Sequence, residues 1–198
     1  EKETAIKGLF IMAQSSGESG YAQGGETKAD GSFQFHVGRP GKYFFRPPPE
    51  YGGRYLASIR IGGEEVLGRE VDLTYGSPGS VRVVYKKDSG WVEGAVQSRE
   101  GAPVGAEGLA VLWPVDERFR LFANRFTAPV SGGGSFAFKN VPPGDYLVFA
   151  LPRAALGFLY DGADADKEIL DQAAPVKVVA GSGSTVEIPW VQWPDESR

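Results

Sequence analysis

The residues that could do chemistry in this sequence are few and scattered. The chain has no cysteine and a single histidine, His36, so disulfides, thiolate metal sites and a cysteine nucleophile are excluded. A histidine that acts as a catalytic base or a zinc ligand needs partner residues, and neither a cysteine nor a second histidine lies near it. Because His36 follows Phe35 in an alternating segment, we expect it to face outward from a strand.

A group of acidic residues is the strongest candidate for a metal site: Asp161, Asp164, Asp166, Glu168 and Asp171. Carboxylate oxygens at close spacing suit Ca²⁺. Their spacing is not that of an EF-hand loop, however, and acidic residues are also favoured at the start of a helix by capping and by the helix dipole. The sequence favours a solvated helix start, keeps calcium as the weaker alternative, and calls for no cofactor.

Two glycine-rich segments lack the surroundings of a catalytic loop. The segment 181–184 reads G-S-G-S, but it sits in a predicted hairpin and has no histidine partner for a serine nucleophile. The run Gly132–Gly134 lacks the lysine and the following helix of a phosphate-binding loop. We therefore predict no catalytic residues and no enzyme activity.

Aromatic residues beside prolines or glycines are the remaining candidates for a binding surface: Trp113, Trp190, Trp193, Tyr51 and Tyr55. Such rings stack on sugars and anchor protein contacts. Packing in a core or at a domain interface is the competing interpretation. Trp190 and Trp193 lie past the last predicted hairpin, so we expect exposure there first.

A sequence motif that occurs twice, called the repeated phrase below, indicates the elements that position these residues. Residues 31–43 read GSFQFHVGRPGKY and residues 134–146 read GSFAFKNVPPGDY, so both follow G-S-F-x-F-x-x-x-x-P-G-x-Y without a gap. Such self-similarity indicates two copies of one β domain. Alternate phenylalanines can face one core, and the Pro-Gly turn predicts a hairpin to the next strand.

The chain therefore reads as two tandem domains, 1–88 and 89–198, separated by a short hydrophilic joint at 86–90. Strands are predicted over 4–12, 32–37 and 80–86 in the first domain, and over 91–96 and 109–113 in the second. The segment 163–172 predicts one short helix with Ile169 and Leu170 facing inward. The many turns that 28 Gly and 14 Pro imply argue against a helical bundle.

Composition narrows the class of partner. The net charge is −4, so the chain carries no basic footprint for nucleic acid. No apolar run approaches the roughly 18–20 residues that span a bilayer. The sequence starts Glu-Lys-Glu-Thr without a methionine, which we interpret as a processed or trimmed product.

Residues 92–106, VEGAVQSREGAPVGA, followed by GSFAFKNVPPGDYLV at 134–148, resemble the carboxypeptidase-regulatory-like domain. That family has a transthyretin-like, or prealbumin-like, β-sandwich related to the B-type repeats of bacterial collagen adhesins. The resemblance covers most of 91–150, and residues 1–88 look like a more degenerate copy that keeps D-G-S-F-x-F and P-G-x-Y. It implies an exported accessory or structural module without catalytic residues to transfer.

Related adhesin repeats often join a first-strand lysine to a last-strand asparagine by a covalent link. Lys7 lies in the predicted first strand, but the only asparagines, Asn124 and Asn140, lie outside any predicted closing strand. We therefore expect no such link in this chain.

The sequence thus predicts an all-β protein of two tandem prealbumin-like antiparallel β-sandwich domains, with one short helix in the second. The expected function is that of a non-catalytic exported structural or interaction module: a spacer, an adhesin-like protein or a subunit of a surface assembly. Its expected partners are proteins, or further copies of itself, bound through free sheet edges. A carbohydrate-binding module for polysaccharide is the alternative. The expected location is secreted, cell-surface or periplasmic in a bacterium.

Overall fold

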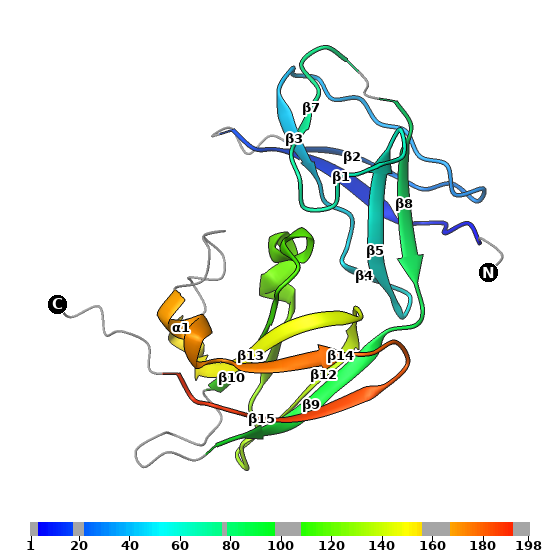
Figure 1. Ribbon diagram of the computed structural model, residues 1–198. Helices are drawn as coiled ribbons and strands as arrows, with labels where there is room; N and C mark the ends of the chain where they lie inside the picture. Colours follow the sequence, from blue (N-terminus) through cyan, green and yellow to red (C-terminus); the bar gives the residue numbers. More distant parts are fainter. Residues whose placement is uncertain (1–3, 18–21, 77–78, 98–107, 156–166, 192–198) are drawn as a thin grey trace. The chain divides into compact units, whose positions relative to one another are not determined.

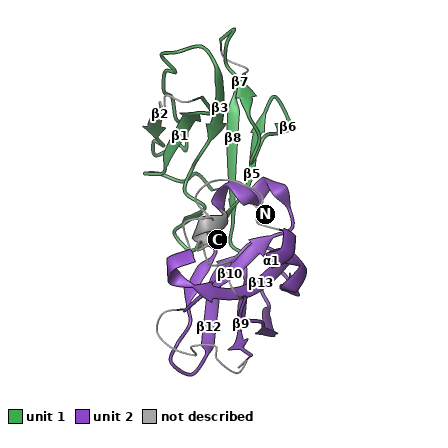
Figure 2. Cartoon of the chain, turned by 90° about the vertical axis from the view of Figure 1, so that its left-hand side faces the viewer, with its two compact units in different colours: residues 1–87 green, residues 88–198 purple. Residues whose placement is uncertain are grey.

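A computed structural model describes residues 4–17, 22–76, 79–97, 108–155 and 167–191 (Figure 1). The chain divides into two compact units, Glu1–Lys87 and Asp88–Arg198, which Figure 2 distinguishes by colour. The described residues form mostly β-strands, and the ladders between these strands are antiparallel except for one in unit 2. The predicted all-β class with antiparallel β-sandwich units is thereby confirmed.

Each unit contains a four-stranded antiparallel sheet, and the two sheets have the same topology. In unit 1 the order is β2-β1-β3-β7, formed by β1 (Phe10–Ser15), β2 (Ala22–Glu26), β3 (Lys42–Phe45) and β7 (Val71–Asp72). In unit 2 the order is β11-β10-β13-β14, formed by β10 (Gly108–Pro114), β11 (Thr127–Pro129), β13 (Gly144–Pro152) and β14 (Ala174–Val178). The similarity of the two sequence segments therefore extends to the path of the chain.

The second sheets of the two units differ. In unit 2 it has the order β12-β9-β15, formed by β9 (Gly90–Val96), β12 (Ser135–Val141) and β15 (Gly183–Ile188). In unit 1 it consists of β4 (Glu50–Tyr51), β5 (Arg54–Ile61), β6 (Glu64–Glu65) and β8 (Val81–Lys86). Strand β5 lies at its centre, since it pairs with each of the other three strands.

The core of unit 2 lies on both faces of β10 and β13, because both strands are apolar at consecutive positions. Tyr146 and Val148 face β9 and β12, together with the buried Phe136 and Phe138. Phe149 packs on the opposite face, with Ile169 of the short helix α1 (Lys167–Gln172). The pleat puts Phe149 one position out of phase with Tyr146 and Val148, so its ring lies on the other face of the sheet.

The repeated phrase forms the same turns in both units. Gly31 and Gly134 have φ angles of 80° and 81°, and each donates its N–H to the carbonyl three residues earlier, at 2.9 and 2.8 Å. At the other end of the phrase, the buried Tyr43 and Tyr146 each donate a hydroxyl hydrogen bond of 2.8 Å to the carbonyl four residues earlier. The glycine and tyrosine that the two copies share therefore have an architectural role.

The predicted hairpin within this phrase is wrong. In unit 2, β12 pairs with β9 whereas β13 pairs with β10 and β14, so the Pro-Gly turn carries the chain from one sheet to the other. The second predicted hairpin fails in the same way, because β14 pairs with β13 and β15 with β9. Alternating apolar residues specify which side chains face a core, but they do not specify which strand lies beside them.

Two strand predictions in unit 1 also need correction. The opening strand begins at Phe10 rather than at residue 4, because Gly8 has a φ of 78° and interrupts the extended backbone. Residues 32–37 alternate between exposed and half-buried side chains as predicted, yet they belong to no strand. The closing strand predicted over 80–86 is present as β8. In unit 2, the 3₁₀ helix η1 (Glu117–Arg125) lies between β10 and β11 in the chain.

Candidate functional site

The candidate site is the place in unit 1 that β9 occupies in unit 2. Strand β9 lies at the centre of its sheet, antiparallel to β12 and parallel to β15. The counterpart of β12 in the repeated phrase is the segment 32–37. Strand β8 closes unit 1 as β15 closes unit 2, and it pairs only with β5 among the described strands. No described strand lies between β8 and 32–37.

Burial of the repeated phenylalanines shows the effect of this difference. Phe136 and Phe138 are 5% and 6% exposed, and their rings pack edge to face with centroids 5.7 Å apart. The matching Phe33 and Phe35 are only half-buried, and their rings stack at 6.2 Å. On β8, the side chains of Val81, Val83, Val84 and Tyr85 are half-buried as well. Apolar side chains on both sides of the missing strand position therefore remain accessible to water.

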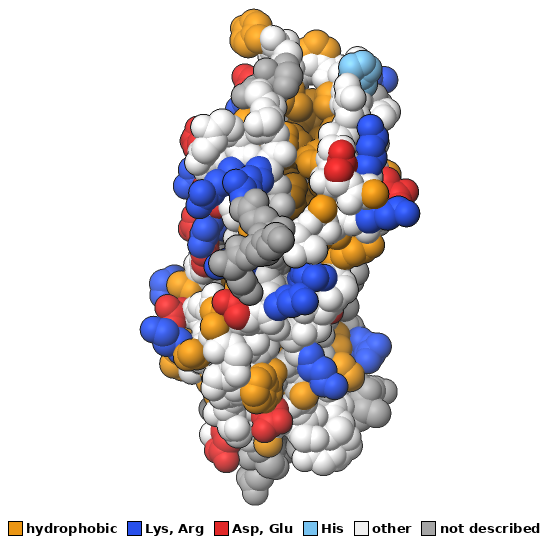
Figure 3. Space-filling view, turned by 90° about the vertical axis from the view of Figure 1, so that its right-hand side faces the viewer, with side chains coloured by type: hydrophobic (Ala, Val, Ile, Leu, Met, Phe, Trp, Pro, Cys, Tyr) orange, Lys and Arg blue, Asp and Glu red, His pale blue; other side chains and the backbone are white. Residues whose placement is uncertain are grey.

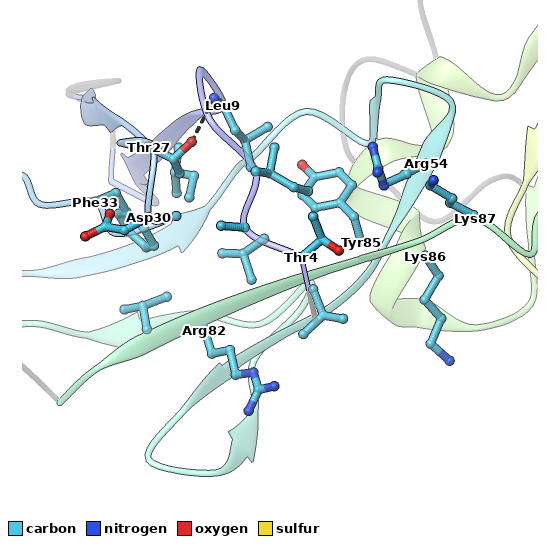
Figure 4. Close-up of a pocket in the computed structure, with 17 residues that line it drawn as sticks. Thr4, Leu9, Thr27, Asp30, Phe33, Arg54, Arg82, Tyr85, Lys86 and Lys87 are labelled. Carbon is cyan, nitrogen blue, oxygen red and sulfur yellow. Dashed lines mark hydrogen bonds between the residues drawn. The ribbon is translucent and has the colours of Figure 1, made fainter. Parts of the chain in front are cut away.

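A groove of about 720 Å³ occupies this position. Figure 3 shows it in unit 1 as a hollow lined with hydrophobic side chains and bordered by charged ones. Its walls include Phe33 from the repeated phrase and residues 81–87 from β8 and the residues that follow, and its floor includes Leu9 and Ile11. Phe33, Leu9 and Tyr85 are among the side chains drawn around it in Figure 4.

The floor of the groove is held by hydrogen bonds that join two segments of unit 1. The N–H of Leu9 donates to the hydroxyl of Thr27 at 2.9 Å (Figure 4), and the N–H of Thr27 donates to the carbonyl of Leu9 at 2.9 Å. Leu9 and Thr27 are both buried. The floor of the groove is thus part of the folded framework of unit 1.

The residues that precede β1 also line the groove. Thr4, Ala5 and Ile6 all line the groove. Ala5 lies directly against Gly31, since a Cβ added to that glycine would lie 3.1 Å from the Cβ of Ala5. In unit 2 the matching Gly134 lies at the end of β9, where its carbonyl accepts a hydrogen bond from Val96. The part of the groove beside Gly31 therefore corresponds to the carboxyl end of β9 in unit 2.

The charged side chains of the groove are mostly basic. Arg54, Arg82, Lys86 and Lys87 contribute to its lining against the single carboxylate of Asp30. The pKa of Asp30 is lowered because its carboxylate accepts hydrogen bonds from the hydroxyl and the N–H of Ser32. Burial raises the pKa of Tyr85, whose hydroxyl donates to the carbonyl of Pro48. These groups suit recognition of an apolar ligand with acidic groups.

The aromatic residues predicted as a binding surface do not gather at one place. Trp113 and Trp190 are 4% and 8% exposed, which differs from the exposure expected of Trp190, because both rings pack into the two cores of unit 2. Trp193 lies outside the described residues. Tyr55 is buried. Tyr51 is half-buried, and its hydroxyl donates a hydrogen bond of 3.1 Å to the carbonyl of Lys7. Neither tyrosine offers an open ring face of the kind that was predicted.

The acidic residues predicted as a weak calcium site are only partly described. Asp161, Asp164 and Asp166 lie outside the described residues. Glu168 lies in the first turn of α1, and Asp171 accepts a hydrogen bond from Lys167 at 2.6 Å. Among the residues that the structure describes, no three His, Cys, Asp or Glu side chains are grouped so as to hold a metal ion.

His36 is exposed, as the alternation predicted. Of the residues considered for a covalent link, Lys7 is exposed and precedes β1, and Asn140 lies in β12 with a φ of 55°. Asn124 lies within η1. Neither asparagine lies in a closing strand.

Three exposed aromatic residues were not predicted from the sequence, Phe10, Tyr75 and Trp91, and of these Trp91 lies beside a cavity. Its side chain is 44% exposed on the outer face of the β12-β9-β15 sheet, and its ring lies over Gly183, where a Cβ would be 2.3 Å from the indole nitrogen. A shallow cavity of about 330 Å³ beside it is lined by Glu93, Lys139 and Asn140. The alternation of β9 could have indicated this exposure, because Val92 and Val96 face the core and Trp91 therefore faces the opposite side.

In the described part of the chain, no helix has the length and hydrophobicity of a membrane span. No protein-family model matches the chain, and no curated protein matches it.

Distant likenesses to solved structures were found. The chain is 13% identical, with a TM-score of 0.38, to GBS52, the minor pilin of Streptococcus agalactiae, and the match covers 98% of this chain and 88% of that one. It is 12% identical, with a TM-score of 0.30, to the Bacillus anthracis TIE protein, over 96% of this chain and 32% of that one. For BcpA, the major pilin subunit of Bacillus cereus, the identity is 12% and the TM-score 0.28, over 96% and 41%. Likenesses this distant define neither a family nor a function.

Proposed function

We propose that this protein is a non-catalytic structural or interaction module that binds another polypeptide through the groove of unit 1. The observation that carries the proposal is the unfilled place in the second sheet of unit 1, which unit 2 fills with β9. Accessible apolar side chains beside a free sheet edge are a ready template for an added polypeptide.

The chemistry of the groove favours a binding role over a catalytic one. Its titratable side chains are spread along the rim and are mostly basic, whereas catalysis of acid–base or nucleophilic type needs a nucleophile and a base within hydrogen-bond reach. The groove also extends along a whole strand, a shape that suits an extended chain.

We expect such a module to act outside the cytoplasm, as an exported protein. The resemblance of the second unit to carboxypeptidase-regulatory-like domains supports it, and the absence of cysteine is compatible with it. Within that setting the module acts as a spacer, an adhesin-like protein or a subunit of a bacterial surface assembly, in contact with other protein chains.

Site-specific photo-crosslinking tests the proposal. A benzophenone amino acid replaces Phe33 in the groove, and in a control it replaces Phe10, which is 54% exposed on β1 of the same unit. In the cells that make the protein, illumination should join the Phe33 variant to a peptide of another polypeptide, identified by mass spectrometry, and the Phe10 variant should give no such product. Equal products from both positions, or none from Phe33, would contradict the proposal.

Carbohydrate binding is a second candidate, favoured by one observation. Trp91 presents an exposed ring beside Glu93, Lys139 and Asn140, and an aromatic face with polar neighbours suits a sugar ring. Titration with bacterial and plant polysaccharides should then change tryptophan fluorescence in the wild type and leave Trp91→Ala unaffected. Absence of any change in the wild type removes this candidate.

A further inference from the structure

Unit 2 indicates what kind of ligand would fit the groove of unit 1. It has a four-stranded sheet of the same topology, and β9 fills the position that corresponds to the groove. The four-stranded sheets have the same topology, and the repeated phrases turn at matching residues. Unit 2 has β9 between the repeated phrase and the closing strand, and unit 1 has no described strand at that position. We infer that the groove of unit 1 accepts a β-strand from a second polypeptide chain, inserted parallel to β8 and antiparallel to residues 32–37. This inference rests on the proposed function and specifies the ligand.

The backbone pattern of β9 defines which groups of unit 1 the strand would meet. Val96 donates its N–H to the carbonyl of Gly134, and the register continues with Gly94 opposite Phe136 and Val92 opposite Phe138. Because hydrogen-bonded pairs alternate in an antiparallel ladder, the backbone groups of Phe136 and Phe138 face β9. By the repeat, those of Phe33 and Phe35 face the groove. No backbone hydrogen bond joins residues 33–37 to any other described residue.

The side-chain pattern of β9 defines the sequence of the strand. Val92 and Val96 are buried, at 0% and 8% exposure. Gly94 lies between them, where a Cβ would be 2.9 Å from the ring of Phe136 and 1.8 Å from the carbonyl oxygen of Val186. A strand that fills the groove therefore carries an apolar residue, a small residue and an apolar residue at alternate positions, with the small residue over Phe33.

The charges of the groove define the other face of the strand. Outward-facing residues of β8 include Arg82 and Lys86, which are exposed, and Lys87 and Arg54 also line the groove. Opposite charges on neighbouring strands attract, and like charges repel. The outward positions of the strand are therefore acidic or polar, as Glu93 is at the corresponding position of β9.

A synthetic peptide of residues 89–97, SGWVEGAVQ, is the probe that follows, because its sequence is known to make these contacts in unit 2. Added to the ¹⁵N-labelled full chain, it should saturably shift the amide signals of residues 33–37 and 81–86 and protect the Phe33 and Phe35 amides from exchange. The same peptide with Gly94→Val should not bind. Shifts elsewhere without protection of Phe33 and Phe35, equal binding of the Gly94→Val peptide, or no binding of either peptide would overturn the inference.

Charge-reversal variants supply the second arm, on surface residues whose replacement leaves the fold intact. Arg82→Glu should weaken binding of the peptide by a few fold, because Glu93 lies opposite Thr185 in unit 2 and the 103-residue offset of the repeat puts the exposed Arg82 at that place in β8, so that one attraction across strands becomes a repulsion. Lys177→Glu in β14 of unit 2, equally exposed, should leave it unchanged. Equal effects of the two variants would contradict strand insertion beside β8.

The two proposals fail in different ways. Photo-crosslinks specific to Phe33, combined with a peptide that neither binds nor protects residues 33–37, would keep the groove as a protein-binding site and overturn the inserted strand. Crosslinks absent from Phe33 would overturn the proposed function, whatever the peptide does.

Discussion

The repeated phrase forms the same turns in the two units, but a neighbouring strand packs beside it in only one of them. In unit 2, β9 lies beside the phrase, and Phe136 and Phe138 are buried. In unit 1 the same place is a groove, and Phe33 and Phe35 are half-buried. The comparison shows that the turns of this fold are specified locally, by glycine and tyrosine, whereas the burial of its phenylalanines depends on a strand distant in sequence.

The largest expected effect comes from truncating the repeated phenylalanines. Phe136→Ala should destabilise unit 2 by about 3–5 kcal/mol through the cavity it leaves, whereas Phe33→Ala should cost unit 1 about 1–2 kcal/mol, because less area is lost from a half-buried ring. All four tryptophans lie in unit 2, so urea unfolding followed by tryptophan fluorescence reports that unit alone. Amide signals of β1 and β3 report unit 1. Equal costs in the two units would break the comparison.

Adding a side chain at the closely packed Gly94 of β9, the central strand of its sheet in unit 2, should have the next largest effect. Gly94→Ala places a Cβ against the backbone of β15, so the strands must separate, at a cost of about 1–3 kcal/mol. Gly133→Ala is the matched control, since its Cβ would meet only the hydroxyl of Ser131 at 4.0 Å. Tryptophan-detected urea unfolding should show a loss for the first variant and almost none for the second. A Gly94→Ala protein as stable as the wild type would mean that β9 and β15 are less closely apposed.

Removing the tyrosine hydroxyls tests the shared turn itself. Tyr146→Phe and Tyr43→Phe each delete a hydrogen bond to a carbonyl four residues earlier, which should cost about 0.5–1.5 kcal/mol in each unit. The two values should agree because the turn does not depend on β9. A cost confined to one unit, measured with the same two reporters, would show that the turns are not equivalent.

The smallest effect distinguishes the two units by pH. The turn before Ser32 is closed by the carboxylate of Asp30, and the matching turn before Ser135 by the hydroxyl of Ser131. The pKa of Asp30 is lowered from its ordinary 3.8 by the hydrogen bonds from Ser32, so the contact is complete above that value and is lost as the pH falls through the lowered pKa. In an NMR titration, the Ser32 amide should move with a midpoint below 3.8, and the Ser135 amide should not follow it. A midpoint above 3.8 would contradict this account.

Much of the fold was accessible from the sequence because it is encoded locally. The repeated phrase, β8, β9 and the inward-facing Ile169 of α1 follow from alternation, turn residues and helix caps. The partners of each strand were not accessible, since Pro142–Gly144 suits a hairpin and a crossing between sheets equally well. The opening strand was placed too early because the positive φ of Gly8 depends on its tertiary hydrogen bond to Thr27.

The candidate site was less predictable than the fold. A groove left by a missing strand has no motif, and it becomes visible only when the pairing of Phe136 and Phe138 with β9 is compared with the segment 32–37. The exposure predicted for Trp190 was wrong for a related reason. Trp113 and Trp190 sit beside prolines at strand ends, and such positions are either buried or exposed depending on the packing above them.

Residue-resolved amide hydrogen exchange of the free full-length chain tests the central claim most directly. The account predicts that the amides of Phe33 and Phe35 exchange almost as fast as in an unstructured peptide, while those of Phe136 and Phe138 exchange only when β9 separates from β12. Slow exchange at all four positions would show that a strand already covers the phrase in unit 1, and it would contradict the open groove on which the proposals depend.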